Sequence, residues 1–198
     1  MPAMGGAAEV TEADARERAT SAPIPSLAAL IASHKAPVYG YLTRSGVSPA
    51  DRDDLFQEVF LKVHGALASA PADAIAPWLF AIVVNTVRSH FRKTQVRAIV
   101  RLDGSADPDV MTAEPGPDRA LEARRTAAWL DAQIARLPLE QREVILLCAV
   151  EGLELADAAA ALGAPLETVK TRLRRARLAL AEARAKVSMR EEREGGSR

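Results

Sequence analysis

The pattern of apolar and polar positions over residues 137–180 predicts three consecutive helices. The first opens after Pro138, which suits the first turn of a helix because its missing N–H would have no partner there. Gly152 ends this helix. The second helix covers residues 154–162 and stops at Gly163, since glycine is the usual residue just past a helix C-terminus.

A third helix is predicted to start at Pro165, with its apolar residues recurring at steps of three and four. The short second helix, the glycine turn and this third helix together predict a helix-turn-helix, in which the small Ala159 lies where the two helices cross. The positions expected to be buried on the third helix are Leu166, Val169, Leu173, Ala176 and Leu180.

The opposite face of the third helix is cationic. The stretch 166–178 contains five basic residues and one acid, Glu167. Arginine and lysine bind phosphates or guanine edges, and threonine contacts bases or phosphates, so this face suits the major groove of DNA. A solvated basic face on an ordinary helical hairpin is the alternative. The candidate DNA contacts are Thr168, Lys170, Thr171, Arg172, Arg174 and Arg175.

Earlier in the chain, helical spacing predicts three more helices. One begins after Ser26 as N-cap and meets a kink or break at Pro37. The next starts near Asp51, and its acids suit a helix N-terminus. The third opens at Pro77 after a loop over 68–76, begins apolar and ends basic, which suits either core packing or a platform for single-stranded nucleic acid.

Composition supports an all-helical chain, because 48% of its 198 residues are hydrophobic, only 4% are aromatic and alanine is abundant. The formal net charge is zero, but the charges are segregated: residues 85–101 hold five basic residues and no acid, and 103–122 hold six acids and one arginine. We therefore expect two small helical domains joined by a flexible acidic linker, the second a helix-turn-helix. The expected segments are a disordered tail 1–25, a first domain 26–100, a linker 101–120, a second domain 121–184 and a tail 185–198.

Several classes of site have no support in the sequence. The single Cys148 cannot form an internal disulfide or a cysteine zinc cluster, and we expect it to be a small core residue. His34, His64 and His90 are dispersed, and there is no glycine-rich phosphate loop or metal-ligand spacing, so we expect no catalytic residue, no metal and no cofactor. Without an apparent signal peptide or membrane span, a cytoplasmic protein is expected.

Three motifs carry a resemblance to a known family. They are Asp51-x-x-Asp54-Leu-x-Gln-Glu-x-Phe60, Trp78-Leu-Phe-x-Ile-x-x-Asn85, and Leu137-Pro through Thr168-Val-Lys-Thr-Arg-Leu-x-Arg-Ala-Arg177. In this order and spacing they resemble the extracytoplasmic-function (ECF) group of the bacterial sigma-70 family of RNA polymerase sigma factors. The resemblance implies a subunit that binds core RNA polymerase and directs it to promoters.

The resemblance also implies roles for particular residues. Asp54, Gln57 and Glu58 match the motif that docks on core RNA polymerase. The cationic face of the third helix of the second domain matches the part that reads the −35 promoter element. Family members are commonly held inactive by an anti-sigma protein that masks both domains. The residues that match the region melting and holding the −10 element are Asn85, Arg88, Arg92 and Lys93.

This chain departs from the family pattern at three positions. Val84 stands where a basic residue is often found, Ser89 where an acid is usual, and Ala158 where a larger aliphatic residue is expected. A helix-turn-helix regulator that binds duplex DNA on its own is the alternative function. The two differ in their need for polymerase, because a sigma factor requires it for strong specific binding.

Overall fold

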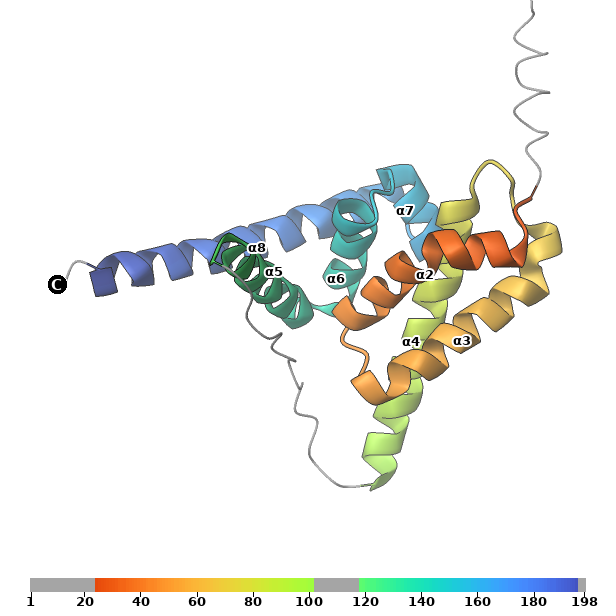
Figure 1. Ribbon diagram of the computed structural model, residues 1–198, viewed down its shortest axis with the longest axis horizontal. Helices are drawn as coiled ribbons and strands as arrows, with labels where there is room; N and C mark the ends of the chain where they lie inside the picture. The colour runs from red at the N-terminus through yellow and green to blue at the C-terminus, as the bar shows by residue number, and fades with distance from the viewer. Residues whose placement is uncertain (1–23, 102–117, 196–198) are drawn as a thin grey trace, which may run out of the picture.

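The computed structural model describes residues 24–101 and 118–195, and within these ranges the chain forms helices and turns without any strand. This confirms the all-α class (Figure 1). Most of the linker expected at 101–120, and residues 1–23 of the tail expected at 1–25, lie outside the described residues.

The first half contains three helices, α2 Leu27–Arg44, α3 Pro49–Ala66 and α4 Ile75–Arg101. Ser26 caps α2 as predicted, because its hydroxyl accepts a hydrogen bond from the Ala29 N–H at 3.3 Å. α2 runs through Pro37 as one helix rather than being broken there. Between α3 and α4 lie a single 3-10 turn, η1 Leu67–Ser69, and a short loop.

The second half contains α5 Asp118–Arg136, α6 Leu139–Ile145, a π-helical turn η2 Leu146–Val150, α7 Leu155–Leu162 and α8 Leu166–Gly195. Gly163 ends α7 with φ of 60°, a left-handed conformation that side chains with a Cβ rarely adopt. α7, this turn and α8 form the predicted helix-turn-helix.

The third predicted helix of the second half is longer than expected. α8 continues to Gly195, through most of the segment expected to be a tail from residue 185. That segment is rich in arginine and glutamate, both strong helix formers. The expected buried stripe is correct at Val169, Leu173 and Ala176, but Leu166 is 38% exposed because it lies in the first turn of α8.

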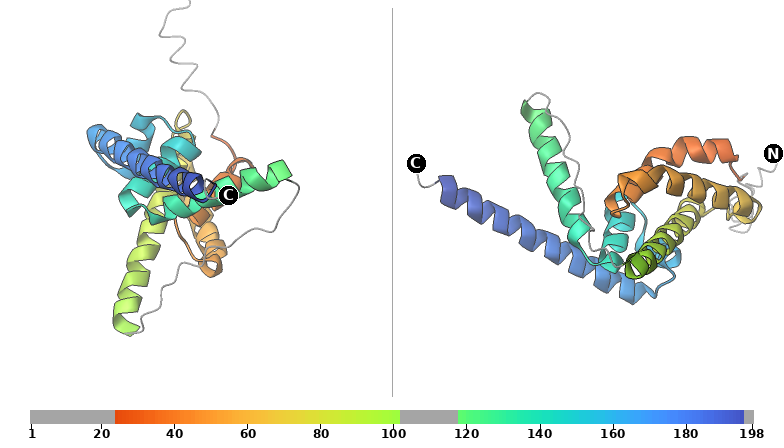
Figure 2. Two further views of the ribbon diagram at one scale, coloured as in Figure 1. Left: turned by 90° about the vertical axis from the view of Figure 1, so that its left-hand side faces the viewer. Right: turned by 90° about the horizontal axis from the view of Figure 1, so that it is seen from below.

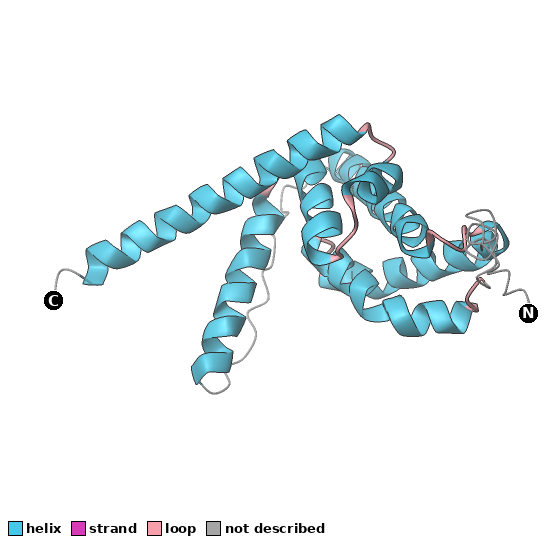
Figure 3. Cartoon of the chain, turned by 90° about the horizontal axis from the view of Figure 1, so that it is seen from above, coloured by secondary structure: helices cyan, strands magenta, loops and turns pink. Residues whose placement is uncertain are grey.

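The two halves, expected as separate domains, pack against each other and share one cluster of buried side chains. The most extensive contact between them joins α4 to α7, and α2 also contacts α5. Two helices project from this body: α5 and α8 diverge in a V from the point where they meet (Figures 2 and 3). The candidate functional side chains lie on the surfaces of α3, α4 and α8.

Candidate nucleic-acid interface

The polar face of α3 carries the first group of candidate residues. Asp54 and Gln57 are exposed, and Glu58 is partly exposed. Lys62 forms an ion pair with Glu58 at 2.7 Å and also donates to the Thr86 hydroxyl on α4 at 3.1 Å. The hydrogen bond that Lys62 donates to Glu58 lowers the pKa of Glu58, so the carboxylate stays ionised at neutral pH. The structure thus brings these three residues together on one helix face, as predicted.

Leu61 is a neighbour of this face that the motif did not single out. It lies one turn after Gln57 on α3, and 70% of it is exposed to solvent. The apolar side of the same helix is buried on the opposite face, at Leu55, Val59, Phe60 and Val63. The face of α3 turned to solvent is therefore polar and acidic with one apolar side chain.

The basic half of α4 does not present its four candidate residues alike. Asn85, Arg92 and Lys93 are exposed. Arg88 is instead turned toward the second half of the chain. Its Nε and Nη2 donate to the two carboxylate oxygens of Glu143, each at 2.7 Å, and its Nη1 donates to the Leu162 carbonyl at 3.2 Å. Arg88 thus differs from the other three candidates, because its guanidinium is bound to Glu143 and Leu162.

Glu143 is a residue that sequence reasoning missed. It is 2% exposed, next to the buried run of residues 144–147. The hydrogen bonds that Arg88 donates to the Glu143 carboxylate raise the pKa of Arg88, which keeps the guanidinium charged despite partial burial. A glutamate bordering an otherwise apolar helix segment was the only sequence signal of this pair.

Two further arginines connect the halves. Arg142 on α6 donates to the Ser45 carbonyl at the end of α2 at 2.6 Å, and to the carbonyls of Ala135 and Leu137. Burial lowers the pKa of Arg142. Arg44 on α2 forms an ion pair with Asp131 on α5 at 2.9 Å. Polar contacts therefore join the halves in addition to the apolar packing.

The cationic face of α8 is open to solvent. Lys170, Thr171, Arg174 and Arg175 are exposed, as predicted, and Thr168 is partly exposed. Two of the cations have acidic partners: Lys170 pairs with Glu167 at 2.7 Å, and Arg172 pairs with Glu140 on α6 at 2.7 Å.

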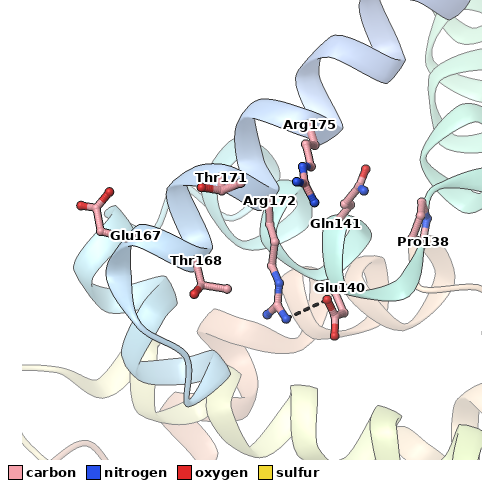
Figure 4. A pocket seen from close by; sticks show the side chains of 8 residues that line it. All are labelled: Pro138, Glu140, Gln141, Glu167, Thr168, Thr171, Arg172 and Arg175. Carbon is pink, nitrogen blue, oxygen red and sulfur yellow. Dashed lines mark ion pairs between the residues drawn. The ribbon is translucent and has the colours of Figure 1, made fainter.

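A cavity of about 480 Å³ lies between this face and α6 (Figure 4). Arg172 crosses it toward Glu140, and the Arg175 side chain lies near Gln141. The cavity is lined by Pro138, Glu140, Gln141, Glu167, Thr168, Thr171, Arg172 and Arg175. Its hydroxyl, amide and guanidinium groups suit contact with a polyanion, whereas the carboxylates of Glu140 and Glu167 oppose it.

Other chemistry is not apparent in the described residues. They contain no cluster of three or more histidine, cysteine or acidic side chains that would hold a metal. Cys148 is half-buried and unpaired, and burial raises the pKa of its thiol. Over the same residues, no helix is both long and apolar enough to cross a bilayer.

These features define a class of DNA-binding transcription protein. The chain is all-helical, and it combines a polar acidic helix face, a helix with a basic end and a helix-turn-helix with a cationic second helix. Comparison with protein families agrees: residues 30–97 match sigma-70 region 2, and residues 127–180 match sigma-70 region 4. The chain belongs to the sigma-70 family, in its ECF group. It is an alternative sigma factor that directs RNA polymerase to promoters, and the comparisons favour this over a free-standing helix-turn-helix regulator.

Characterised relatives resemble the chain over most of its length. RNA polymerase sigma factor NccH of Alcaligenes xylosoxydans is 35% identical over 137 residues, which cover 68% of this chain and 74% of NccH. RNA polymerase sigma factor CnrH of Cupriavidus metallidurans is 31% identical, with 76% of this chain and 82% of CnrH covered. ECF RNA polymerase sigma factor EcfG of Rhodopseudomonas palustris is 38% identical, with 65% and 68% covered.

Two solved structures are similar to the fold. One is CnrH in complex with the cytosolic domain of CnrY, with a TM-score of 0.59, 25% identity, and 86% of this chain and 94% of that chain covered. The other is the sigma factor RpoE in complex with the anti-sigma factor NepR from Bartonella quintana, with a TM-score of 0.62, 27% identity, and 77% and 92% covered. Both neighbours are sigma factors bound to a second protein.

Two of the departures from the family pattern lie in buried positions. Val84 on α4 and Ala158 on α7 are both fully buried, at 0% exposure. α4 and α7 make the main contact between the halves. A basic side chain at 84 would place a charge in an apolar environment, and a larger one at 158 would overfill a packed site. The residues present at these two positions therefore suit the packed arrangement of this chain.

Proposed function

We propose that this sigma factor uses three separate surfaces for its three contacts. Asp54, Gln57 and Glu58 on α3 dock on core RNA polymerase. They are polar, share one helix face and leave the apolar side of α3 to the core. The exposed Leu61 beside them adds apolar area to this contact.

The basic half of α4 is proposed to hold the opened −10 element. Asn85, Arg92 and Lys93 are exposed there and offer amide and cationic groups to phosphates and bases. Arg88 completes this set once it is free of Glu143. Holding an unstacked strand needs several such contacts, because unstacking costs a few kcal/mol per base.

The face of α8 formed by Thr168, Lys170, Thr171, Arg172, Arg174 and Arg175 is proposed to read the −35 element in the major groove. The observation that carries the assignment is the exposure of Thr171, Arg174 and Arg175 on the second helix of a helix-turn-helix. Side chains of this type on a solvent-facing helix reach base edges and phosphates together.

The proposal extends to regulation and location. Since CnrH and RpoE, the two structural neighbours, are each bound to another protein, in one case a named anti-sigma factor, we propose that an anti-sigma protein also binds this chain. The chain acts without catalytic residues of its own, because its work is recognition. It is placed in the cytoplasm, where polymerase and promoter DNA meet.

Run-off transcription tests the function directly. Purified core RNA polymerase is mixed with the full chain and a fragmented genomic library, and transcript starts are mapped by sequencing. We expect new starts that depend on the chain and share two upstream elements. Absence of such starts, together with sequence-specific duplex binding by the chain alone, would instead support a free-standing regulator.

A further inference from the structure

We propose that the Glu143 carboxylate binds the Arg88 guanidinium in competition with DNA. This contact makes promoter binding depend on separating the two halves of the chain. The inference rests on the proposed role of Arg88 at the −10 element. In this proposal Glu143 controls when Arg88 can bind DNA, a function that neither half would have alone.

The guanidinium geometry of Arg88 opposes simultaneous binding of Glu143 and a DNA phosphate. Each of the three nitrogens of Arg88 already donates a hydrogen bond, two to the Glu143 carboxylate and one to the Leu162 carbonyl. Carboxylates and phosphates bind the same fork of an arginine through two parallel hydrogen bonds. A DNA phosphate and Glu143 therefore cannot occupy Arg88 in the same way at the same time.

The burial of Glu143 also opposes its displacement. Glu143 is 2% exposed, so a phosphate that displaced it would leave its charge unpaired in the interior. An unpaired buried charge is strongly unfavourable. Arg88 is thus released only when Glu143 becomes exposed to solvent, which requires α6 and α7 to move away from α4.

The contacts around this pair act together with it. On α4, Val84 and Val87 lie on the same face as Arg88 and are buried, and Ala158 and Leu162 of α7 are buried in the same cluster. The Arg142 and Arg44 contacts join other parts of the two halves. Breaking this set exposes apolar area and costs several hydrogen bonds, so the closed form is a distinct state and not a loose association.

Promoter geometry favours opening of this state. The −35 and −10 elements lie less than two helical turns apart, roughly 60–70 Å of duplex. In the closed form α4 is packed directly on α7 of the helix-turn-helix. The packed halves hold both DNA-binding surfaces in one body, and binding of one half to core polymerase gives their separation a driving force.

The test compares full-length variants in the absence of polymerase. Glu143→Gln keeps the size of the side chain and removes its charge. Glu182→Gln, at an exposed position on α8, is the control for the loss of one negative charge. Binding of a fluorescein-labelled, mixed-sequence single-stranded oligonucleotide is followed by anisotropy, and the radius of gyration by small-angle X-ray scattering.

We expect Glu143→Gln to expand and to bind the strand about tenfold more tightly than the wild type, since apparent affinity scales with the open fraction. Glu182→Gln should match the wild type in both measurements. The double variant Arg88→Ala with Glu143→Gln should expand but lose the gain in affinity. A Glu143→Gln chain that stays compact, or expands without tighter binding, would overturn the inference.

A second measurement needs no variant and keeps the test valid if Glu143→Gln folds poorly. Saturating the wild type with the same oligonucleotide should raise the radius of gyration of the protein, measured by small-angle neutron scattering at the match point of the oligonucleotide, whereas a bound protein that remains compact would contradict competition. Run-off transcription by the wild type with core polymerase separates the two proposals. Normal promoter-specific transcription with no effect of Glu143→Gln on unaided binding sinks only this inference, and absence of transcription sinks the proposed function.

Discussion

The Arg172 guanidinium on α8 lies 2.7 Å from the Glu140 carboxylate on α6, across the cavity between these helices (Figure 4). Lys170 is similarly paired with Glu167. Two of the cations proposed to face DNA are thus neutralised in the free chain. DNA phosphates must replace these carboxylates, which reduces the net gain from each contact.

The Glu140 pair gives the first prediction. Glu140→Gln should strengthen binding of the full chain to duplex promoter DNA by up to about fivefold, because it frees Arg172 and removes a charge that repels phosphate. The salt dependence should steepen by about one phosphate contact. Anisotropy with a labelled duplex over a range of salt concentrations measures both effects. Glu182→Gln is the control, and an unchanged affinity would mean that Arg172 does not reach DNA.

Arg174 and Arg175, which form no ion pair with another described residue, give the second prediction. Arg174→Ala and Arg175→Ala should each weaken −35-dependent transcription by about 1–3 kcal/mol in DNA affinity if the side chain reads a base. The exposed Lys186, three turns further along α8, provides Lys186→Ala as a control that should retain output. Run-off transcription from a mapped promoter, with and without substitutions in its −35 element, measures the effect. Unchanged output from both arginine variants would refute the assignment.

The face of α3 gives the third prediction. Gln57→Ala combined with Glu58→Lys should abolish capture of core polymerase, because it removes an amide and reverses a charge on the proposed contact. Glu58 is paired with Lys62 at an exposed site, so the fold should lose no more than about 1 kcal/mol. Pull-down of core enzyme and thermal unfolding measure the two effects. Glu182→Lys, an equal change in charge on α8, should bind normally, and normal capture by the double variant would contradict the docking role.

The contact between the halves gives the fourth prediction. Ala158 is fully buried on α7, whereas Ala160 on the same helix is exposed. Ala158→Leu should lower the free energy of unfolding by about 1–3 kcal/mol through overpacking. Ala160→Leu adds the same atoms on the solvent side and should change it by less than about 0.5 kcal/mol. Denaturant unfolding of both variants measures the difference, and equal stability would show that the α7 surface is not packed as described.

Local chemistry explains why so much of the fold could be predicted. Pro138, Gly152 and Gly163 mark helix ends through their own backbone preferences, and the structure has helix boundaries next to each of them. The cationic face of α8 followed from helical periodicity alone. Leu166 was placed wrongly because periodicity does not tell which end of a stripe reaches the core.

The contact between the halves could not be predicted in this way. Arg88 and Glu143 are 55 positions apart, and each has a plausible local explanation, as a DNA contact and as a helix-favouring residue. Charge segregation suggested two domains held apart, whereas the burial of Val84 and Ala158 depends on shapes that meet only in three dimensions. Which surfaces of the two halves pack together depends on the shapes of their side chains in the fold, and a single sequence does not show those shapes.

The last prediction concerns pH and the partly buried Glu151, where the π-helical turn η2 ends. Burial raises the pKa of Glu151 to about 7 from an ordinary value of 4.5, an effect that the nearby Arg44 only partly offsets. Between these two values the folded chain holds a proton that the unfolded chain has lost. By linkage, stability should therefore fall as pH rises from about 4.5 through 7, and then level off.

Glu151→Gln removes this titration, so it should leave the variant more stable than the wild type at pH 8 by about 1 kcal/mol, a value reduced because the side chain is partly exposed. At pH 5, where the wild-type carboxyl is mostly neutral in the folded state, the two should differ little. The neighbouring Glu154 is exposed, and Glu154→Gln controls for the loss of charge. Denaturant unfolding at both pH values measures the difference. A gap between Glu151→Gln and the wild type that is the same at pH 5 and pH 8 would show that Glu151 ionises as freely in the folded chain as in the unfolded one.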